Sequence, residues 1–378
     1  MNNGFQTLRE RNRLGITCSA AIIAMLIATL WPFDPFPPNR VRWLRETNGI
    51  EFDGAGLVLS KEPLPTAETT AQQSCALELL LRPAALESSY TILSFYKPDN
   101  PTQFLVKQWT DGLLVTHDVV DAKGRLKRSK FDLDHAFQVD RVLLVTIVSG
   151  PNGTLVYTDG HRAKILPKFK MSRSELSGQI VLGTSPVDYE PWVGRILGLA
   201  IYSRELTAAE VLQHYKSWTH GVSVDPSEVN GATAIYYFTE RAGREVHNAV
   251  VSGPDLEMSK HFAVPHKAML ASPLKEFKAT WGYVKDVLLN VAGFVPLGFL
   301  LCAYFASTRS RGKAIFCTIL AAGMLSFVIE VLQAYIPRRV SGMTDIITNT
   351  LGAAIGAGFA RPSAVRGILR KAGAADIS

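Results

Sequence analysis

Cysteine is scarce in this chain of 378 residues, and its placement excludes a disulfide-built domain. Of the four cysteines, Cys18, Cys302 and Cys317 lie in apolar runs, which leaves only Cys75 in the remaining, soluble-like sequence. A single cysteine cannot form a disulfide within that part. Cysteine usage therefore neither supports nor excludes an oxidising compartment.

Motifs for the common cofactors and catalytic centres are also missing from the sequence. There is no Walker A loop, dinucleotide fingerprint or zinc-ligand spacing, and no run of closely spaced acids typical of retaining glycoside hydrolases. The net charge is +7, but the basic residues are scattered or flank the apolar runs. That pattern is typical of membrane flanks rather than of a nucleic-acid surface. We expect no cofactor, no assignable metal and no nucleic-acid partner.

What the sequence does contain is apolar segments concentrated near its two ends. At about 1.5 Å per residue, each can approach the ~30 Å hydrocarbon core of a bilayer. The first has the outline of a signal peptide, but its Pro-rich flank carries no small-residue cleavage site, which favours an uncleaved span. Four spans are predicted, over residues 14–31, 286–305, 314–335 and 344–360.

An even number of spans places both termini on the same side of the membrane. Basic residues near the expected 308–313 turn and in the tail favour the cytoplasm for that side, by the positive-inside rule. Residues 1–13 and 361–378 are then cytoplasmic, and the segment between the first two spans is extracytoplasmic. We expect a multi-pass protein of the bacterial inner membrane.

Short strand patterns fill the segment between the first two spans. Apolar and alternating runs are separated by Gly, Pro, Asn and Asp, and Asp159-Gly160 predicts a tight hairpin. "PWVGRILGLAIYSRELTAAEVLQHYKSW" and "GIEFDGAGLVLS" resemble the laminin-G-like, concanavalin A-like jelly-roll family, with residues 232–250 as a circularly permuted or completing strand. The resemblance implies an all-β sandwich over residues 40–262 that binds glycan or protein. Members of the family can hold calcium, but no site can be assigned here.

Aromatic side chains in this segment have two interpretations. Trp109, Tyr157 and Trp192 could stack on sugars, although a core or hairpin-packing role is favoured for each.

The C-terminal spans resemble the VanZ-like membrane family. The resemblance rests on "DVLLNVAGFVPLGFLL" and "EVLQAYIPRRVSGMTDIITNTLGAAIG", in that order. It implies a membrane protein, with no established reaction, and the family's name suggests a link to the glycopeptide-antibiotic response. The predicted fold class is a membrane α-helical bundle of four spans plus an all-β jelly-roll sandwich in the extracytoplasmic loop.

Polar residues in these spans share helix faces and fall at one depth. Three pairs are spaced i, i+4 or i, i+3, and two arginines occupy the connecting turn. Counting residues places the pairs within ~10 Å of the outer interface. A charge costs ~2.5 kcal/mol or more at the centre of a span and less near the interface. The predicted polar cluster comprises Asp286, Asn290, Glu330, Gln333, Arg338, Arg339, Asp345 and Asn349.

Structural interpretations of these residues remain open at this stage. Asp286 and Asp345 could be helix N-caps, and Asn290 and Asn349 could link helices. The arginines could anchor at headgroups, and Glu330 could pair with one of them.

The favoured function is binding of an envelope lipid or lipid-linked glycan headgroup, in which arginines contact phosphate and acids accept from sugar hydroxyls. The expected partners are membrane lipids and a polysaccharide or peptidoglycan precursor. Two alternatives stand beside it: a membrane-anchored adhesion or sensing module with purely structural helices, and a membrane-embedded hydrolase or transferase acting on a lipid phosphate. Binding is favoured over catalysis.

Overall fold

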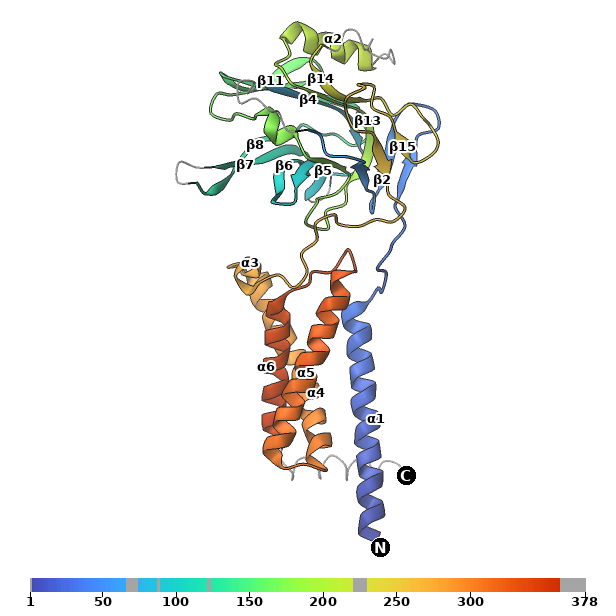
Figure 1. The fold of residues 1–378 in the computed structure, drawn as a ribbon, viewed down its shortest axis with the longest axis vertical. Coiled ribbons are helices and arrows are strands. Elements are labelled where there is room, and N and C mark those ends of the chain that lie inside the picture. The colour runs from blue at the N-terminus through green and yellow to red at the C-terminus, as the bar shows by residue number, and fades with distance from the viewer. Residues whose placement is uncertain (1, 66–73, 87–88, 121–123, 220–229, 361–378) are drawn as a thin grey trace. The chain divides into compact units, whose positions relative to one another are not determined.

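The computed structural model describes residues 2–65, 74–86, 89–120, 124–219 and 230–360 (Figure 1). The chain divides into two compact units. The helical unit comprises Met1–Pro35 and Ala268–Ser378, and the sandwich unit comprises Phe36–Lys267. The predicted tail 361–378, with its basic residues, lies outside the described residues.

One sheet of the sandwich unit, sheet A, has the order β1-β2-β13-β4-β9-β10-β11, and β14 also pairs with β13. Its pairs are antiparallel, and β14 completes the sheet as expected for the segment after residue 232. The strands are β1 (Val41–Trp43), β2 (Ile50–Asp53), β4 (Cys75–Pro83), β9 (Leu143–Gly150), β10 (Gly153–Thr158), β11 (His161–Leu166), β13 (Val193–Tyr202) and β14 (Ala232–Tyr236).

The second sheet, sheet B, has the order β15-β16-β3-β12-β5-β6-β7-β8, also antiparallel. A short 3₁₀ helix, η1 (Arg173–Leu176), precedes β12. The strands are β3 (Val58–Ser60), β5 (Ser89–Lys97), β6 (Asn100–Trp109), β7 (Gly112–Val120), β8 (Leu126–Leu133), β12 (Gln179–Leu182), β15 (Glu245–Val246) and β16 (Leu256–Met258). The predicted all-β sandwich is confirmed.

The core lies between the two sheets because alternate residues of each strand point inward. On β13, Ile196, Leu199 and Ile201 face the shared core, while Ala200 and Tyr202 belong to a second cluster on the outer face. The hairpin expected at Asp159-Gly160 joins β10 to β11, with positive φ at both turn residues, as a type I′ turn requires.

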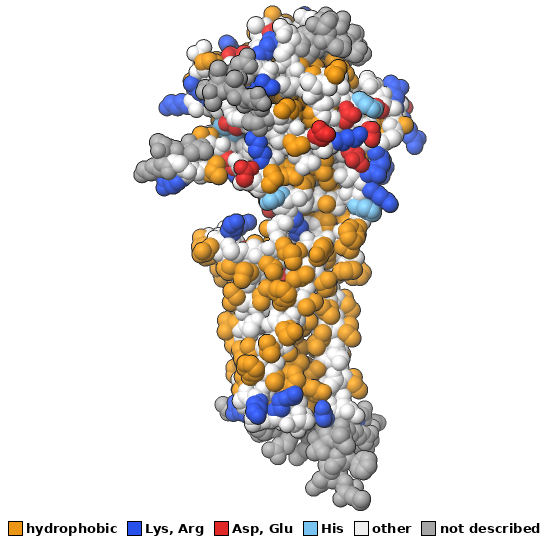
Figure 2. Space-filling model, in the orientation of Figure 1, with side chains coloured by type: hydrophobic (Ala, Val, Ile, Leu, Met, Phe, Trp, Pro, Cys, Tyr) orange, Lys and Arg blue, Asp and Glu red, His pale blue; other side chains and the backbone are white. Residues whose placement is uncertain are grey.

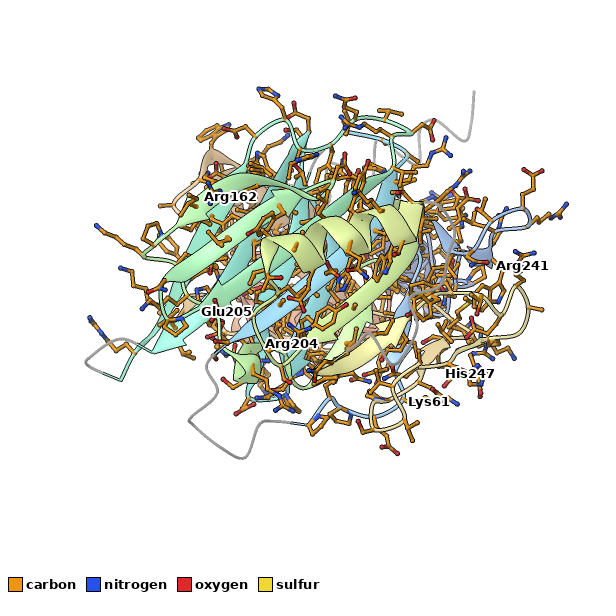
Figure 3. The ribbon with its side chains drawn as sticks, turned by 90° about the horizontal axis from the view of Figure 1, so that it is seen from above. Lys61, Arg162, Arg204, Glu205, Arg241 and His247 are labelled. Carbon is orange, nitrogen blue, oxygen red and sulfur yellow. The ribbon has the colours of Figure 1, made fainter. Side chains whose placement is uncertain are left out.

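The outer face of sheet A carries a helix, α2 (Ala208–Thr219), which lies across its strands (Figure 3). The helix begins with a capping box. Glu210 N donates to Thr207 Oγ1 at 3.3 Å, and Thr207 N donates to Glu210 Oε2 at 2.7 Å. These contacts fix where the helix starts and therefore which outward side chains of the sheet it covers.

The helical unit contains α1 (Asn2–Leu30), α3 (Pro273–Glu276), α4 (Trp281–Ala306), α5 (Arg311–Ala334) and α6 (Met343–Phe359). Within the described residues, three helices are long and apolar enough to cross a membrane: Arg11–Leu30, α4 and α5. The fourth predicted span, α6, has 17 residues, or about 25 Å at 1.5 Å per residue. Hydrophobic side chains dominate the visible surface of these helices, and Lys and Arg gather at one end (Figure 2).

Small residues allow α4 and α6 to pack closely. A Cβ on Gly352 or Gly356 would collide with the carbonyl oxygen of Val291 or Val295, respectively, and one on Gly298 would collide with Ala353. Small residues one helical turn apart permit this close approach of two helices.

Candidate headgroup site at one end of the helical unit

The predicted polar residues gather where α4 and α6 begin and α5 ends. Because α5 runs antiparallel to both neighbours, these three termini lie at the same end of the helical unit (Figure 1). Helix termini carry backbone N–H and C=O groups that lack partners within the helix. The side chains at this end therefore have backbone groups as well as each other to bind.

Glu330 is buried, with 1% of its surface exposed, and binds the start of α6. Its Oε2 accepts from the backbone N–H of Gly342, the N-cap residue of α6, at 2.8 Å. A carboxylate is favoured there because the positive end of the helix dipole faces it. Glu330 therefore joins α5 to the first turn of α6.

A second carboxylate, Glu276 at the end of α3, binds the same helix start. Its Oε2 accepts from Thr344 N at 3.0 Å and from Thr344 Oγ1 at 2.6 Å. Gly342 allows this approach because a Cβ there would collide with Glu276 Oε1. Sequence reasoning missed Glu276. The available signal was the Ser-Pro pair before the second span, which is typical of a helix start, followed by an acid at the end of that short helix.

Two amides connect neighbouring helices. Asn290 Nδ2 on α4 donates to Asp345 Oδ1 on α6 at 2.7 Å. Asn349 Nδ2 on α6 donates to Ser326 Oγ on α5 at 2.9 Å. Asn349 is only 6% exposed, and its Oδ1 is a buried acceptor with no hydrogen-bond partner among the described residues.

Two further predicted residues bind the carboxyl end of α1. Gln333 Nε2 donates to Thr29 O at 3.0 Å, and Arg339 Nη2 donates to Trp31 O at 2.6 Å. These carbonyls lie at a helix terminus, where donors are needed. Gln333 and Arg339 thus stabilise the packing of α1 against the end of α5.

The structure corrects three of the structural interpretations. The N-cap of α4 is Thr280, which places Asp286 well inside the helix, and the N-cap of α6 is Gly342 rather than Asp345. Glu330 binds a backbone N–H, and no described ion pair joins it to an arginine. Asp286 and Arg338 are exposed side chains at the same end.

Four carboxylates share this end, and the ion pairs of the described residues include none of them. Every described ion pair lies in the sandwich unit, and none includes Glu276, Asp286, Glu330 or Asp345. No group of three or more His, Cys, Asp or Glu side chains among the described residues is arranged to hold a metal ion. The described donors to these carboxylates are backbone N–H groups, the Asn290 amide and the Thr344 hydroxyl.

The aromatic residues singled out in the sandwich unit separate into two kinds. Trp192 and Tyr157 are buried, and Trp192 Nε1 donates to Gln108 Oε1 at 2.7 Å, so both belong to packed regions. Trp109 is exposed where β6 turns into β7.

The apolar helices, their polar end and the two-sheet unit define a membrane protein that carries a β-sandwich. Residues 236–366 match a family model described as VanZ/LLP1, so the predicted VanZ-like region is confirmed. The match begins in β14 and includes α4, α5 and α6. No curated protein matches the chain in sequence.

Solved structures similar to the chain include a proposed carbohydrate-binding protein from Bacteroides ovatus ATCC 8483, with 15% identity and a TM-score of 0.39. That match covers 57% of this chain and 59% of the other, so the chain spans less than two thirds of its length. The binding domain of botulinum neurotoxin DC, in complex with rat synaptotagmin II, has 15% identity and a TM-score of 0.35, with 48% and 46% covered. Likenesses at this level carry no inference about this chain.

Proposed function

We propose that this chain is a four-span protein of the bacterial inner membrane that binds the headgroup of an envelope lipid or lipid-linked glycan. The site is the polar end of the helical unit, built from Glu276 and the predicted cluster. In this proposal the sandwich unit is extracytoplasmic and engages glycan attached to, or near, that lipid. Both termini are cytoplasmic.

The observation that carries the proposal is the surplus of acceptors at this end. Removing one partner of a buried ion pair is costly because it leaves a charge uncompensated. Glu330 has a single described donor, and the orphan Oδ1 of Asn349 lies one helical turn beyond Asp345. A ligand that brings hydroxyl or ammonium donors would compensate these groups.

The arginines in the α5–α6 turn give the site its second chemical feature. A guanidinium matches a phosphate with two parallel hydrogen bonds. Arg338 is exposed in this turn, next to Arg339, which holds α1. A glycan that is linked to lipid through phosphate would place its phosphate at the turn and its sugar hydroxyls at the acids.

Native mass spectrometry of the protein in mild detergent tests the proposal. The wild type is compared with a Glu330→Gln, Arg338→Ala double variant. Glutamine keeps an oxygen that can accept from Gly342 N, so the variant removes charge while preserving that contact. We expect a discrete co-purified lipid on the wild type and at least a tenfold lower occupancy on the variant.

The matched control is Arg309→Ala, which removes a cation from the α4–α5 turn at the opposite end of the helices. It should keep the lipid. Equal, nonspecific lipid on folded wild type and double variant would contradict the proposal. That result would favour the anchor role, in which Glu276 and Glu330 only cap α6.

A further inference from the structure

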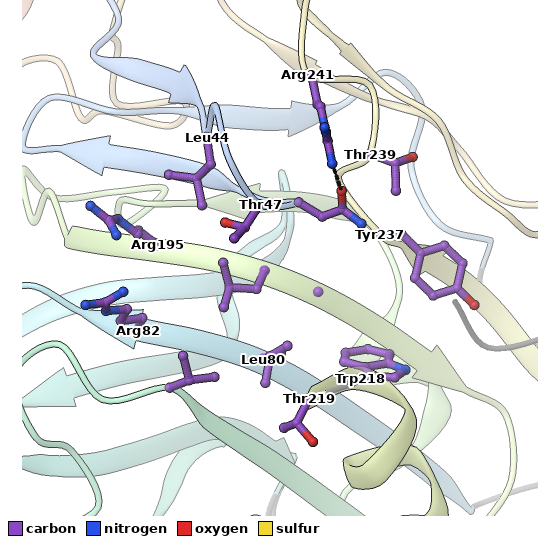
Figure 4. Close-up of a pocket in the computed structure, with 14 residues that line it drawn as sticks. Leu44, Thr47, Leu80, Arg82, Arg195, Trp218, Thr219, Tyr237, Thr239 and Arg241 are labelled. Carbon is purple, nitrogen blue, oxygen red and sulfur yellow. Dashed lines mark hydrogen bonds between the residues drawn. The ribbon is translucent and has the colours of Figure 1, made fainter. Parts of the chain in front are cut away.

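The outer face of sheet A continues past the carboxyl end of α2 into a cavity of about 660 Å³ (Figure 4). Its floor is formed by outward-facing Leu80 of β4 and Leu197 of β13, with Val142 beside them. Trp218 and Thr219 of α2, together with Tyr237, form one end, and Arg82 and Arg195 form the other (Figure 4). Among the described residues, the lining contains three arginines and no carboxylate.

Two of these arginines lie directly opposite each other in the sheet. In the antiparallel pairing of β13 with β4, Arg195 is the register partner of Arg82. Side chains opposed in this way have Cβ atoms only about 5 Å apart, and like charges there are destabilising. An anion bound over the pair would be attracted by both guanidinium groups and would offset their mutual repulsion.

The charges around the pair are balanced only in part. Arg195 Nε donates to Glu51 Oε1 at 2.8 Å, and Arg82 Nε lies 3.2 Å from Asp140 Oδ1. The Arg82 contact does not have hydrogen-bond geometry, since this buried nitrogen has no hydrogen-bond partner in the part of the chain that the structure describes. Above the cavity, Arg241 Nη2 donates to the neutral Asn48 Oδ1 at 3.3 Å (Figure 4). The cavity therefore keeps a surplus of positive charge.

The opposite end offers flat aromatic surfaces. Trp218 packs over Gly198, where an added Cβ would lie 2.7 Å from the indole ring. Trp218 and Tyr237 meet edge to face, with ring centroids 6.4 Å apart and an interplanar angle of 69°. The electron-rich face of such rings attracts the polarised C–H groups of a sugar ring. Most of the floor is apolar, as is usual for sites of this size.

We infer that this cavity is a binding site for an anionic saccharide, with the acid group over Arg82 and Arg195 and a sugar ring against Trp218 and Tyr237. Carboxylate and phosphate share the required chemistry, so the ligand is a uronic acid or a sugar phosphate. This inference deepens the proposed glycan role of the sandwich unit by naming residues and a ligand class. It uses no residue of the helical site.

Isothermal titration calorimetry of the full-length protein in detergent tests the inference with three probes. Trigalacturonate carries carboxylates, its fully methyl-esterified form is the neutral counterpart, and glucose 1-phosphate carries a phosphate. We expect at least one anionic probe to bind and the ester to bind at least tenfold more weakly. Which anion binds identifies the acid group of the ligand.

Variants then locate the site. Arg82→Gln with Arg195→Gln should weaken binding of the anionic probe at least tenfold, and Trp218→Phe should weaken it by a smaller factor. The control is Arg162→Gln with Lys164→Gln on β11, which removes the same charge from the same sheet outside the cavity (Figure 3). The control should bind like the wild type, and thermal unfolding confirms that each variant is folded.

Three results would overturn the inference: neither anion binds at concentrations up to about 1 mM, the ester binds as tightly as the acid, or the folded arginine variant binds as tightly as the wild type. The lipid measurement on the helical variants is independent of these titrations. Failure of one site is therefore distinguishable from failure of the other.

Discussion

Among the described residues, each unit buries one glutamate almost completely, and the two carboxylates are satisfied in different ways. Glu78 on β4 is 0% exposed, and Glu330 on α5 is 1% exposed. Glu78 Oε2 binds His214 Nδ1 at 2.8 Å and accepts from Tyr202 O–H at 3.1 Å, and its Oε1 accepts from Thr146 Oγ1 at 3.0 Å. Glu330 has a single donor among the described residues, the backbone N–H of Gly342.

This difference separates a structural carboxylate from one that still has unused acceptor positions. An ionised carboxylate has about four acceptor positions, and the Glu78 network fills three of them with side chains of the sandwich unit. Glu330 retains most of its capacity in a helix that can span the membrane, where isolated charge is expensive. Glu78 therefore fastens α2 to the sheet through His214, whereas Glu330 keeps acceptor positions for the ligand that we propose.

Replacing Glu78 with leucine should have the largest effect on stability. The change leaves the polar groups of His214, Tyr202 and Thr146 buried without their acceptor. Breaking a buried charged network of this kind costs about 3–5 kcal/mol. Urea unfolding of the detergent-solubilised protein, followed by tryptophan fluorescence, measures the loss.

Thr146→Val is the control for that variant, because it removes one donor and leaves the other two contacts of Glu78. It should cost about 1 kcal/mol. If Glu78→Leu is no more destabilising than Thr146→Val, the comparison between the two glutamates fails.

Close packing in the helical unit predicts the next largest effect. Gly356→Ala should destabilise the protein by about 1–3 kcal/mol, since the new methyl group would meet the carbonyl of Val295 and push α4 and α6 apart. Gly358→Ala, two residues away, has nothing within 4 Å and should be neutral or slightly stabilising. Thermal unfolding in detergent compares the two, and equal midpoints would refute the close contact.

The cap that Glu330 provides predicts a smaller effect. Glu330→Leu leaves Gly342 N without an acceptor and should be about 1–2 kcal/mol less stable than Glu330→Gln, which can still accept that hydrogen bond. The same thermal measurement applies. If both variants lose co-purified lipid but only the leucine variant loses stability, the ligand role and the capping role of Glu330 are separate.

The sequence predicted the architecture well because periodicity and apolar length are local properties. The strand runs, the Asp159-Gly160 turn and the three C-terminal helices follow from them. Helix starts were predicted less well. Asp286 and Asp345 are of a residue type that often caps helices. Thr280 and Gly342 are the N-caps instead, because α4 begins five residues before Asp286 and α6 begins two residues before Asp345.

Partners across the fold could not be predicted from spacing. One structural interpretation paired Glu330 with an arginine of the next turn, but its described partner is the backbone N–H of Gly342, which lies beyond that turn. Glu276 was missed because its contact with Thr344 spans 68 residues. Trp218 was part of a quoted motif, yet its position in the same cavity as Arg82 and Arg195 depends on where α2 crosses the sheet.

The pH dependence of the sandwich unit should show the smallest effect. Burial lowers the pKa of His214, and the charge of Arg204 lowers it further. The hydrogen bond with Glu78 and the charges of Glu78 and Glu210 raise it. These raising contributions are larger together, so the pKa is raised above 6.5. Tyr202 stacks against His214 with centroids 5.8 Å apart. A raised pKa in the folded state means that the folded protein binds the proton more tightly than the unfolded chain does. The stabilisation is therefore fully present below about pH 6.5 and is lost as pH rises through the folded-state value.

We expect a loss of about 1 kcal/mol across that interval, because the charge is lost while a neutral imidazole can still donate to Glu78. Urea unfolding of wild type and His214→Gln as a function of pH measures it. Glutamine can donate to Glu78 but does not titrate, so its profile should be flat where the wild type falls. Parallel profiles would assign the pH dependence to another group.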